Sequence, residues 1–584
     1  MKKMMTTLAL FAATVFGCAA ASSNALAEDV IIDGKAYRKL AVETYRDKMK
    51  AGWIGQIAGV CWGAPTEFRS CGVIMPEENV PKWRPEMIND AFGQDDLYVE
   101  MTFLHSMEVY GLDVSIRQAG IDFANSEYPL WHANVNGRKN LRMGIAPPNS
   151  GRPEFSHCAD DIDYQIEADF SGLISPGLPN NAVHMGEKFG RLMNYGDGMY
   201  AGQFVGAMYA EAFFETDVTK IIETALKAIP AESGYAEMVR DVLGWKKEFP
   251  NDWQACWNKI NEKYQLNPEY RKWDCGKPEN AFNIDVKING AYILVGLLYG
   301  EGDLDNTIII STRCGQDSDC NPSSAAGVLF TTLGFKALPA RFSEKLDEKA
   351  IFDHTAYNFP ALIDVCDSLA KQAVEKEGGF MKEENGESFY YIPQTDVVPS
   401  ALTSCADPTD KPEEGEAARF NEDELKQIKF RMYSDEEWLD KKFAGFRPVQ
   451  MGTDMEPGVH DEYRGDKQVY VMHPVSVDEP GIIAKTCVPS KGDVLYMSVS
   501  CFENGNVAGD YILQVKANGD LLKEVVVSKD VLDSDGWLWI EVPLKKYVGQ
   551  ATVLEIVNKA NDWKWEAAYF RTLGIDSPNS CEID

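Results

Sequence analysis

The spacing of apolar residues changes near residue 450, and this change limits the folds open to the chain. Before it, apolar positions recur with the 3.6-residue period of helices, most clearly at 45–63, 197–215, 218–230, 288–300 and 321–335. After it, short segments alternate with period two, the pattern of half-buried strands. At 584 residues the chain is also too long for one ordinary core. We therefore predict a multidomain protein with an all-α helical domain at about 35–395, followed by a smaller all-β sandwich domain at 451–584.

Strands of the sandwich are predicted at 468–477, 493–502, 510–517, 521–528, 537–544 and 551–558. Asn518-Gly519 lies between two of these segments and is a strong hairpin signal. Trp537 and Trp539 are expected to share one face of a strand, as are Trp563 and Trp565. Paired tryptophans could stack on sugar rings, which would make this a carbohydrate-binding domain. The pattern is more typical of a sandwich core, and we favour the core interpretation.

Residues 396–450 differ from both predicted domains in composition. They are highly charged and show no clear apolar face, as in PEEGEAARFNEDELKQIKFRMYSDEEWLDKKF. We predict a charged linker with one surface helix here.

The first 27 residues have the organisation of a secretory signal peptide. Lys2 and Lys3 form a basic start, an apolar stretch follows at 8–17, and Ala25-Leu26-Ala27 is a cleavage pattern of small residues. The sequence therefore predicts a signal peptide at 1–27 and an exported, periplasmic or extracellular protein. The alternative is a membrane-anchored lipoprotein with its lipid on Cys18, which ranks second because Phe16 is bulky for that motif.

Composition excludes some classes of partner. A formal net charge of -33 argues against nucleic acid, whose phosphates require a basic surface. No later run is long and apolar enough to form a transmembrane segment. The 13 cysteines are scattered, with no CxxC pair and no Cys/His cluster of the zinc type. Some could pair in an exported protein, and buried free thiols are an equal alternative.

Two acidic segments are the strongest candidates for chemistry. GQDDLYVE places Asp95 and Asp96 at a predicted helix start, and GQDSDC does the same with Asp317 and Asp319. One such pair alone would be explained by the helix dipole, which tolerates negative charge at the N-terminus. Two of them leading into apolar helices are harder to explain, because buried carboxylates need positive partners. Divalent cations such as Mg2+ would supply that charge.

A third segment, GVCWGAPTEF at 59–68, ends the first long helix with two glycines, a proline and Glu67. Together with QDD and QDSDC, in this order, it resembles the ADP-ribosylglycohydrolase family, which includes the dinitrogenase-reductase-activating glycohydrolases. The family pattern is G-x-x-x-G-D-A-x-G-x-P-x-E, then [ST]-D-D-T, then D-x-D-[TS] before a Gly/Ala-rich helix. The resemblance covers roughly residues 40–375 and implies an all-α domain with two Mg2+ ions at its centre.

Carried over by position, the resemblance gives the metal-binding residues as Glu67, Gln94, Asp95, Asp96, Asp317, Asp319 and Cys320. Glu67, Asp96 and Asp317 are the implied catalytic residues. The chain departs from the family at four places: Gln94 replaces a Ser/Thr ligand, and Val60, Leu97 and Cys320 replace Asp, Thr and Thr/Ser. Because a thiol is a poor ligand for Mg2+, the ion number, its affinity or the substrate can differ from the family's.

The segment 168–214 resembles the middle of the family's sequence, where Asp169 lies at the expected substrate loop and Asp197 at a second loop. Both are candidate substrate-binding residues, with two plain helix-connecting loops as the alternative. The resemblance implies a metal-dependent glycosyl hydrolase that cleaves a bond at C1 of a ribose-like furanose in a small-molecule or glycan substrate. Export and the paired tryptophans favour a second hypothesis, a furanosidase or other glycosidase acting on extracellular carbohydrate. A third is a non-enzymatic ligand-binding protein, against which retention of the five acids argues.

Overall fold

The computed structural model describes residues 28–576, apart from Pro278, Asp407, Thr409, Asp410, Ser434, Ala444 and Asn506. These residues divide into two compact units. The first, here called the helical unit, comprises the described residues up to Ser115, Tyr128–Ala133 and Ser156–Lys411. The second, here called the C-terminal unit, comprises Ile116–Glu127, Asn134–Phe155 and the described residues from Pro412 onward.

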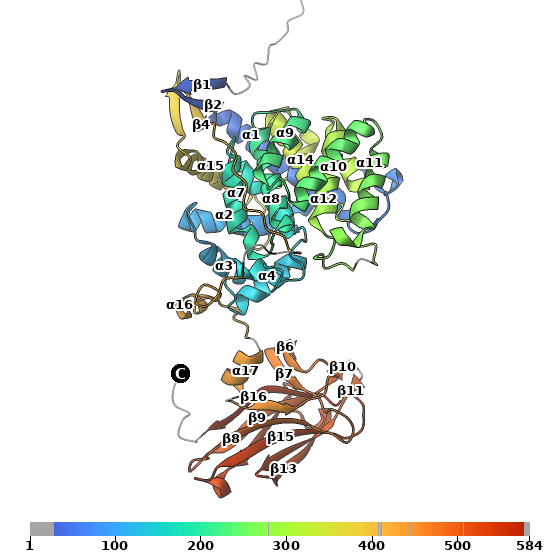
Figure 1. Cartoon of the computed structure of the whole chain (residues 1–584), viewed down its shortest axis with the longest axis vertical. Coiled ribbons are helices and arrows are strands. Elements are labelled where there is room, and N and C mark those ends of the chain that lie inside the picture. The colour runs from blue at the N-terminus through green and yellow to red at the C-terminus, as the bar shows by residue number, and fades with distance from the viewer. Residues whose placement is uncertain are drawn as a thin grey trace, which may run out of the picture. The chain divides into compact units, whose positions relative to one another are not determined.

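The core of the helical unit consists of helices that bury most of their side chains. The central ones are α1 (Val42–Gly63), α8 (Asp197–Ala212), α12 (Val286–Gly300) and α14 (Cys320–Leu333). All four coincide with segments predicted from helical period, and Figure 1 shows where they lie in the helical unit. Every residue of α12 except Tyr299 is buried, as its nearly unbroken apolar sequence requires. The other helices of this unit are α2 (Asp95–Tyr110), α5 (Asp163–Ile166), α6 (Asp169–Leu173), α7 (Pro179–Lys188), α9 (Val218–Ala225), α10 (Gly234–Glu248), α11 (Trp253–Ile260), α13 (Leu304–Arg313) and α15 (Phe359–Lys376).

Glycines on one face of α1 allow it to contact α14 backbone to backbone. Gly55, Gly59 and Gly63 are spaced four residues apart, so they lie on the same face of the helix. A side-chain carbon at Gly59 would lie 2.3 Å from the carbonyl oxygen of Pro322, and one at Gly63 would lie 2.1 Å from that of Ser318. This close approach fixes the end of α1 against the segment that contains Asp317 and Asp319.

A small antiparallel sheet departs from the predicted all-α composition. Its strand order is β1 (Glu28–Ile32), β2 (Lys35–Ala41), β4 (Glu387–Pro393) and β3 (Phe380–Glu384). Tyr390 of β4 packs edge-on against Tyr45 of α1, with ring centroids 5.8 Å apart. The sheet joins the beginning of the described chain to residues that follow α15, which explains why local periodicity did not reveal it.

The C-terminal unit contains the predicted β-sandwich, built from two five-stranded antiparallel sheets. One sheet has the order β13 (Asp520–Val527), β12 (Tyr511–Ala517), β15 (Thr552–Ala560), β8 (Gly481–Cys487) and β5 (Arg447–Gln450). The other has the order β14 (Leu538–Pro543), β9 (Val494–Cys501), β16 (Ala568–Asp576), β7 (Asp466–Met472) and β6 (Gly458–Tyr463). A two-stranded ribbon, β10 (Glu503–Asn504) and β11 (Val507–Ala508), accompanies them. Asn518-Gly519 forms the predicted hairpin, with Ala517 paired to Asp520.

The tryptophans of the sandwich depart from the predicted core placement. Trp537 is buried, but Trp539, Trp563 and Trp565 are 52%, 43% and 48% exposed. Trp563 and Trp565 do not share a strand face, because both lie in the loop between β15 and β16. The core interpretation therefore applies to Trp537 alone.

The segment at 396–450 does not match the predicted surface linker. It contains two helices, α16 (Glu422–Leu425) and α17 (Asp435–Lys442), instead of one. Trp438 and Phe443, in and after α17, are fully buried in the core of the sandwich. The segment before them pairs with α3 (Ile116–Ala124), where the Arg117 guanidinium donates to the Glu424 carboxylate at 2.7 Å. Helix α3 and most of α4 (His132–Arg142) thus belong to the C-terminal unit.

Several sequence predictions concern residues outside this description. The predicted signal peptide at 1–27 and the alternative lipid site at Cys18 both lie outside the described residues. Within residues 28–576, no helix combines the length and apolar character that crossing a membrane requires. No cysteine in the described part of the chain forms a disulfide.

Candidate active site

The two acidic segments come together around the thiol of Cys320. Cys320 is the first residue of α14, and its Sγ lies 3.3 Å from Asp96 Oδ2, although the two residues are 224 positions apart. Its backbone N–H donates to Asp319 Oδ1 at 3.1 Å and to Asp317 Oδ1 at 3.2 Å. Ligand atoms of Asp317, Asp319 and Cys320 lie within 4.8 Å of one another, and all three residues are buried. The N-termini of α2 and α14 therefore share one acidic centre, here called the acid cluster.

Glu67 reaches the same centre from the end of α1. The Thr66 hydroxyl lies 2.8 Å from the Ser318 hydroxyl, and the Phe68 N–H donates to the Gln316 carbonyl at 3.0 Å. These contacts follow from the glycine face of α1, which brings residues 64–68 onto the loop before α14. Glu67 is exposed to solvent, so it lies at the open edge of the acid cluster.

Gln94 and Asp95, two further residues of the predicted group, lie at the start of α2. Gln94 precedes α2 as its N-cap residue, without a side-chain hydrogen bond to the helix, and is half-buried. Asp95 is half-buried and Asp96 is buried. Six of the seven residues that the resemblance gave as metal-binding thus lie close enough for their charges or ligand atoms to act on one another: Glu67, Asp95, Asp96, Asp317, Asp319 and Cys320. Gln94 is placed only by its position next to Asp95, at the start of α2.

The acid cluster holds its negative charge at a high electrostatic cost. Burial raises the pKa of Asp317 to about 7 and raises those of Asp96 and Asp319 well above their ordinary values. Desolvation, followed by the charges of Asp319 and Asp95, raises the pKa of Glu67 to about 8 although the residue is exposed. None of these carboxylates forms an ion pair with a basic side chain of the described residues.

The residues present fit a hard divalent cation. Asp96 Oδ1 is buried and has no hydrogen-bond partner among the described residues, so an electron pair of this oxygen is free for a ligand. Carboxylate oxygens and the Gln94 amide oxygen are ligands that Mg2+ accepts, and only the Cys320 sulfur is a soft donor.

A further buried acid, Glu100, lies behind the acid cluster and was not expected. It follows Asp96 by four residues on the same face of α2, is fully buried, and accepts a hydrogen bond from the Gln56 amide at 2.6 Å. Its other oxygen accepts the Phe170 N–H at 2.8 Å, which fixes the start of α6. The spacing from Asp96 was the only sequence signal, and it is equally typical of an ordinary helix face.

The two candidate substrate-binding residues occupy different surroundings. Asp169, at the start of α6, is fully buried beside the acid cluster, and burial raises its pKa to about 7. Asp197, at the start of α8, accepts the Tyr235 N–H at 2.9 Å and lies 3.7 Å from Lys287 Nζ. Asp197 therefore belongs to a second charged group around Lys287 and stabilises the start of α10.

Comparison with known proteins agrees with this arrangement of motifs. The model of the ADP-ribosylglycohydrolase family matches residues 41–378. This chain belongs to the ADP-ribosylglycohydrolase family. The match covers α1, α2 and α14, and so every element that supplies the acid cluster of this ADP-ribosylglycohydrolase. No curated protein matches the chain.

Solved structures resemble the chain only distantly. An ADP-ribosylglycohydrolase-related protein complex aligns with 57% of this chain and 99% of its own chain, at 12% identity and a TM-score of 0.37. A xylanase 10C from Cellvibrio japonicus, in complex with xylopentaose, aligns with 24% of this chain and 29% of its own, at 16% identity and a TM-score of 0.17. A family GH115 4-O-methyl-alpha-glucuronidase, with specificity for decorated arabinogalactans, covers 71% and 44%, at 10% identity and a TM-score of 0.16. These scores carry no functional conclusion.

Proposed function

We propose that this ADP-ribosylglycohydrolase is a divalent-metal-dependent hydrolase that cleaves a glycosidic bond at C1 of a ribose-like furanose. Family membership supports the hydrolase class. One observation carries the metal dependence: acids from two distant segments converge on Cys320 without a basic partner among the described residues. Such a group is stable as a set of carboxylates only when a cation is bound.

Mg2+ is the proposed ion, with two ions per site and another divalent cation as the alternative. Glu67, Asp95, Asp96, Asp317 and Asp319 would hold it, with Gln94 and Cys320 beside them. When bound, the ions supply positive charge that orients ribose hydroxyls and lowers the pKa of a bound water.

The proposed role of each acidic side chain follows from its exposure to solvent. Asp96 and Asp317 are buried, so their charge acts at short range in a poorly solvated site and favours positive charge that develops on the sugar ring at C1. Glu67 is solvent-exposed at the edge of the acid cluster, where its carboxyl group can take a proton from water or give one to the leaving group. Glu100 is fully buried and fixes the start of α6 through the Phe170 N–H, and Asp169 is fully buried beside the acid cluster.

The experiment measures metal-dependent release of sugar from ADP-ribosyl-arginine and from aryl furanosides, with wild-type protein, Asp317→Asn and chelator-treated protein. We expect release from at least one substrate, lost in the variant and after chelation, and restored by Mg2+. Release from neither substrate by folded, Mg2+-loaded protein would favour a non-enzymatic ligand-binding protein.

A second candidate is a furanosidase or other glycosidase acting on extracellular carbohydrate. It is favoured by the three exposed tryptophans of the sandwich and by the predicted signal peptide, which would export the protein to the periplasm or cell exterior. The same assay separates it, because such an enzyme cleaves the aryl furanosides and leaves ADP-ribosyl-arginine intact. Cell fractionation tests export: protein found only in the cytoplasm would contradict it.

A further inference from the structure

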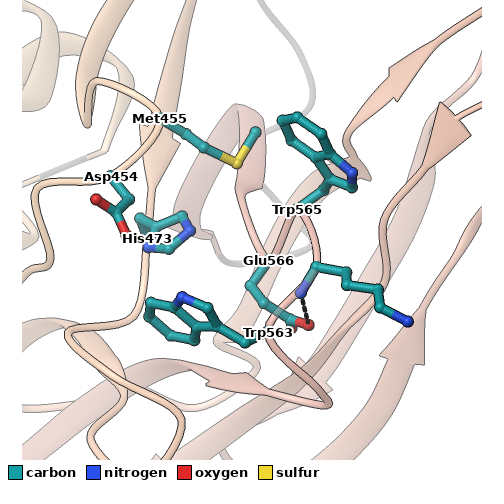
Figure 2. Close-up of a pocket in the computed structure, with 7 residues that line it drawn as sticks. Asp454, Met455, His473, Trp563, Trp565 and Glu566 are labelled. Carbon is teal, nitrogen blue, oxygen red and sulfur yellow. Dashed lines mark hydrogen bonds between the residues drawn. The ribbon is translucent and has the colours of Figure 1, made fainter.

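The sandwich has a pocket of about 340 Å³ formed by three loops, which follow β5, β7 and β15. Asp454, Met455, His473, Trp563, Lys564, Trp565 and Glu566 line it. Figure 2 shows Asp454, His473 and Trp563 on one side of the pocket and Trp565 on the other. This volume lies in the range of small-molecule sites, roughly 300–1,000 Å³.

Internal hydrogen bonds fix the positions of the tryptophan rings. The carboxylate of Glu566 is buried and accepts backbone N–H groups of Asn561 at 2.9 Å and Asp562 at 3.1 Å, so the loop closes around it. Trp563 meets His473 edge-on at 5.4 Å, and Trp565 stacks on Phe502 at 4.8 Å. Both indole rings remain nearly half exposed, on a loop whose backbone is fixed by the buried Glu566 carboxylate.

The polar groups of the pocket suit hydroxyl ligands. His473 is buried, and its Nδ1 lies 2.8 Å from the Pro474 carbonyl oxygen. Because a carbonyl oxygen only accepts, Nδ1 carries the proton in the tautomer that makes this contact, and Nε2 is then the ring nitrogen left to accept. The Asp454 carboxylate supplies a second acceptor beside it. Flat apolar rings next to acceptors match a sugar, which has apolar C–H faces and hydroxyl edges.

We propose that this pocket binds carbohydrate, with a sugar ring on Trp563 or Trp565 and its hydroxyls on His473 and Asp454. The proposal is independent of catalysis in the helical unit. Its test uses the full chain, with xylan, arabinan, arabinogalactan and a soluble β-glucan as probes in affinity electrophoresis and tryptophan-fluorescence titration.

We expect at least one polysaccharide to bind, and Trp563→Ala to weaken that binding by about tenfold or more. Trp539→Ala is the matched control, because Trp539 is also exposed and stacked on an aromatic ring, Tyr496, but lies outside the pocket. Binding that survives in Trp563→Ala and Trp565→Ala would overturn the proposal. So would equal losses in Trp539→Ala, or no binding to any of the four polysaccharides.

A separate cluster of donors, which the spacing of the cysteines did not reveal, lies in the helical unit. Ligand atoms of His132, Asp161 and Cys275 lie within 4.8 Å of one another. Cys275 Sγ lies 3.5 Å from His132 Nδ1, close to the edge of a tetrahedron with bonds of roughly 2.3 Å to sulfur and 2.0 Å to nitrogen. The neighbouring Cys158 thiol raises the pKa of the Cys275 thiol, which makes Cys158 the candidate for a fourth donor.

The backbone presents these donors as a built site. Cys158 and Asp161 share one turn, closed by the Asp161 N–H to the Cys158 carbonyl at 3.1 Å, and their C-x-x-D spacing parallels the C-x-x-C turns of zinc sites. The Cys275 N–H donates to Asp161 Oδ1 at 3.2 Å, which ties the second segment to that turn. Asp161 is fully buried, so its charge calls for a cation.

The geometry points to a transition-metal site, best suited to Zn2+, formed by His132, Cys158, Asp161 and Cys275. Two thiolates and an imidazole select Zn2+ over Mg2+, so this site is chemically distinct from the acid cluster. Metal analysis of the purified full chain, followed by replacement with Co2+, tests it through the thiolate-to-cobalt absorption band.

We expect about one zinc per chain and a thiolate–cobalt band that Cys275→Ser and Cys158→Ser remove. Cys487→Ser is the matched control, because Cys487 is another half-buried free thiol, and Cys320→Ser excludes a signal from the acid cluster. Both controls should keep the band. Absence of the band in wild-type protein, its loss in Cys320→Ser, or a Cys158–Cys275 disulfide in protein purified without reductant would overturn the proposal.

Discussion

Two groups of buried carboxylates lie in the helical unit, and they differ in the source of their positive charge. In the first, Asp160, Asp197 and Asp285 surround Lys287, whose Nζ lies 3.5, 3.7 and 3.0 Å from their oxygens. Burial opposes the charged form of Lys287, but Asp285 and the other acids outweigh it and hold its pKa well above the ordinary value. The second group, the acid cluster, has no basic side chain of the described residues in ion-pair contact.

This difference separates a structural group from a functional one. A charge group that contains its own cation is complete, and its task is to join α8, α10 and α12. A group that lacks one is incomplete, and it retains room and charge for something that binds. Burial alone does not distinguish the two groups, because both contain acids that are almost wholly inaccessible to solvent.

The largest expected effect is on catalysis. Asp317→Asn and Asp96→Asn each remove one charge from the acid cluster, so we expect kcat/KM on the active furanoside to fall at least about a thousandfold. Asp285→Asn removes a charge from the Lys287 group and keeps a residue that can cap α12, so activity should stay within about threefold. If Asp285→Asn lowers activity as much as Asp317→Asn in folded protein, the division into two groups fails.

The next effect is on stability and concerns Lys287 itself. Lys287→Met leaves three acids without their cation, and we expect the free energy of unfolding to fall by about 3–5 kcal/mol, measured by urea titration of the helical circular dichroism. Lys263→Met is the matched control, because Lys263 pairs with Glu237 and Asp241 at 2.6 Å but is partly exposed. Its loss should cost about 1 kcal/mol or less. Equal costs for the two variants would contradict a special role for Lys287.

Much of this comparison follows from the sequence, and the missing parts have physical reasons. The helices α1, α8, α12 and α14 were predictable because their apolar period is local. The meeting of the acidic turns was predictable from the order of the three motifs. Local pattern could not show that Asp197 is neutralised by Lys287, because the two residues lie 90 positions apart on different helices.

Other features depend on contacts or exposure that no single segment encodes. The sheet of β1 to β4 pairs residues near 37 with residues near 393. Trp563 and Trp565 have the spacing of strand residues, but Glu566 holds them in a loop. His132 meets Cys275 across 143 positions. In each case the sequence contains the residues and the tertiary fold supplies their proximity.

The acid cluster also predicts how stability depends on pH. Burial raises the pKa of Asp317 from 3.8 to about 7 in the folded protein, so between these values the metal-free folded state binds a proton that the unfolded chain releases. The contribution of Asp317 to the free energy of unfolding is then greatest below about pH 4. It is lost as the pH rises toward 7, a fall on the order of a few kcal/mol.

Thermal unfolding of chelator-treated protein between pH 4.5 and 7.5 measures this fall, and saturating Mg2+ should flatten it by binding the deprotonated acids. Addition of Mg2+ to Asp317→Asn, which lacks this titrating group, should have a smaller effect. If the stability of the metal-free protein rises over this range, the claim that the acid cluster lacks a cation of its own is contradicted.

The smallest expected effect concerns Cys320, which lies at the centre of the acid cluster without being an acid. Its thiol donates to Asp96 Oδ2 at 3.3 Å, and a serine hydroxyl can make the same hydrogen bond. Burial holds the pKa of this thiol well above its ordinary value, so little thiolate is available as a nucleophile. Because a hydroxyl is a harder donor than a thiol, we expect Cys320→Ser to keep turnover within a few-fold and to lower the half-saturating Mg2+ concentration by about two- to fivefold.

Magnesium titrations of wild-type and Cys320→Ser activity, with Asp317→Asn in parallel, measure both quantities. Loss of turnover in Cys320→Ser together with retained turnover in Asp317→Asn would reverse the assignment, since the working group would then be the thiol and the acids would only shape its surroundings.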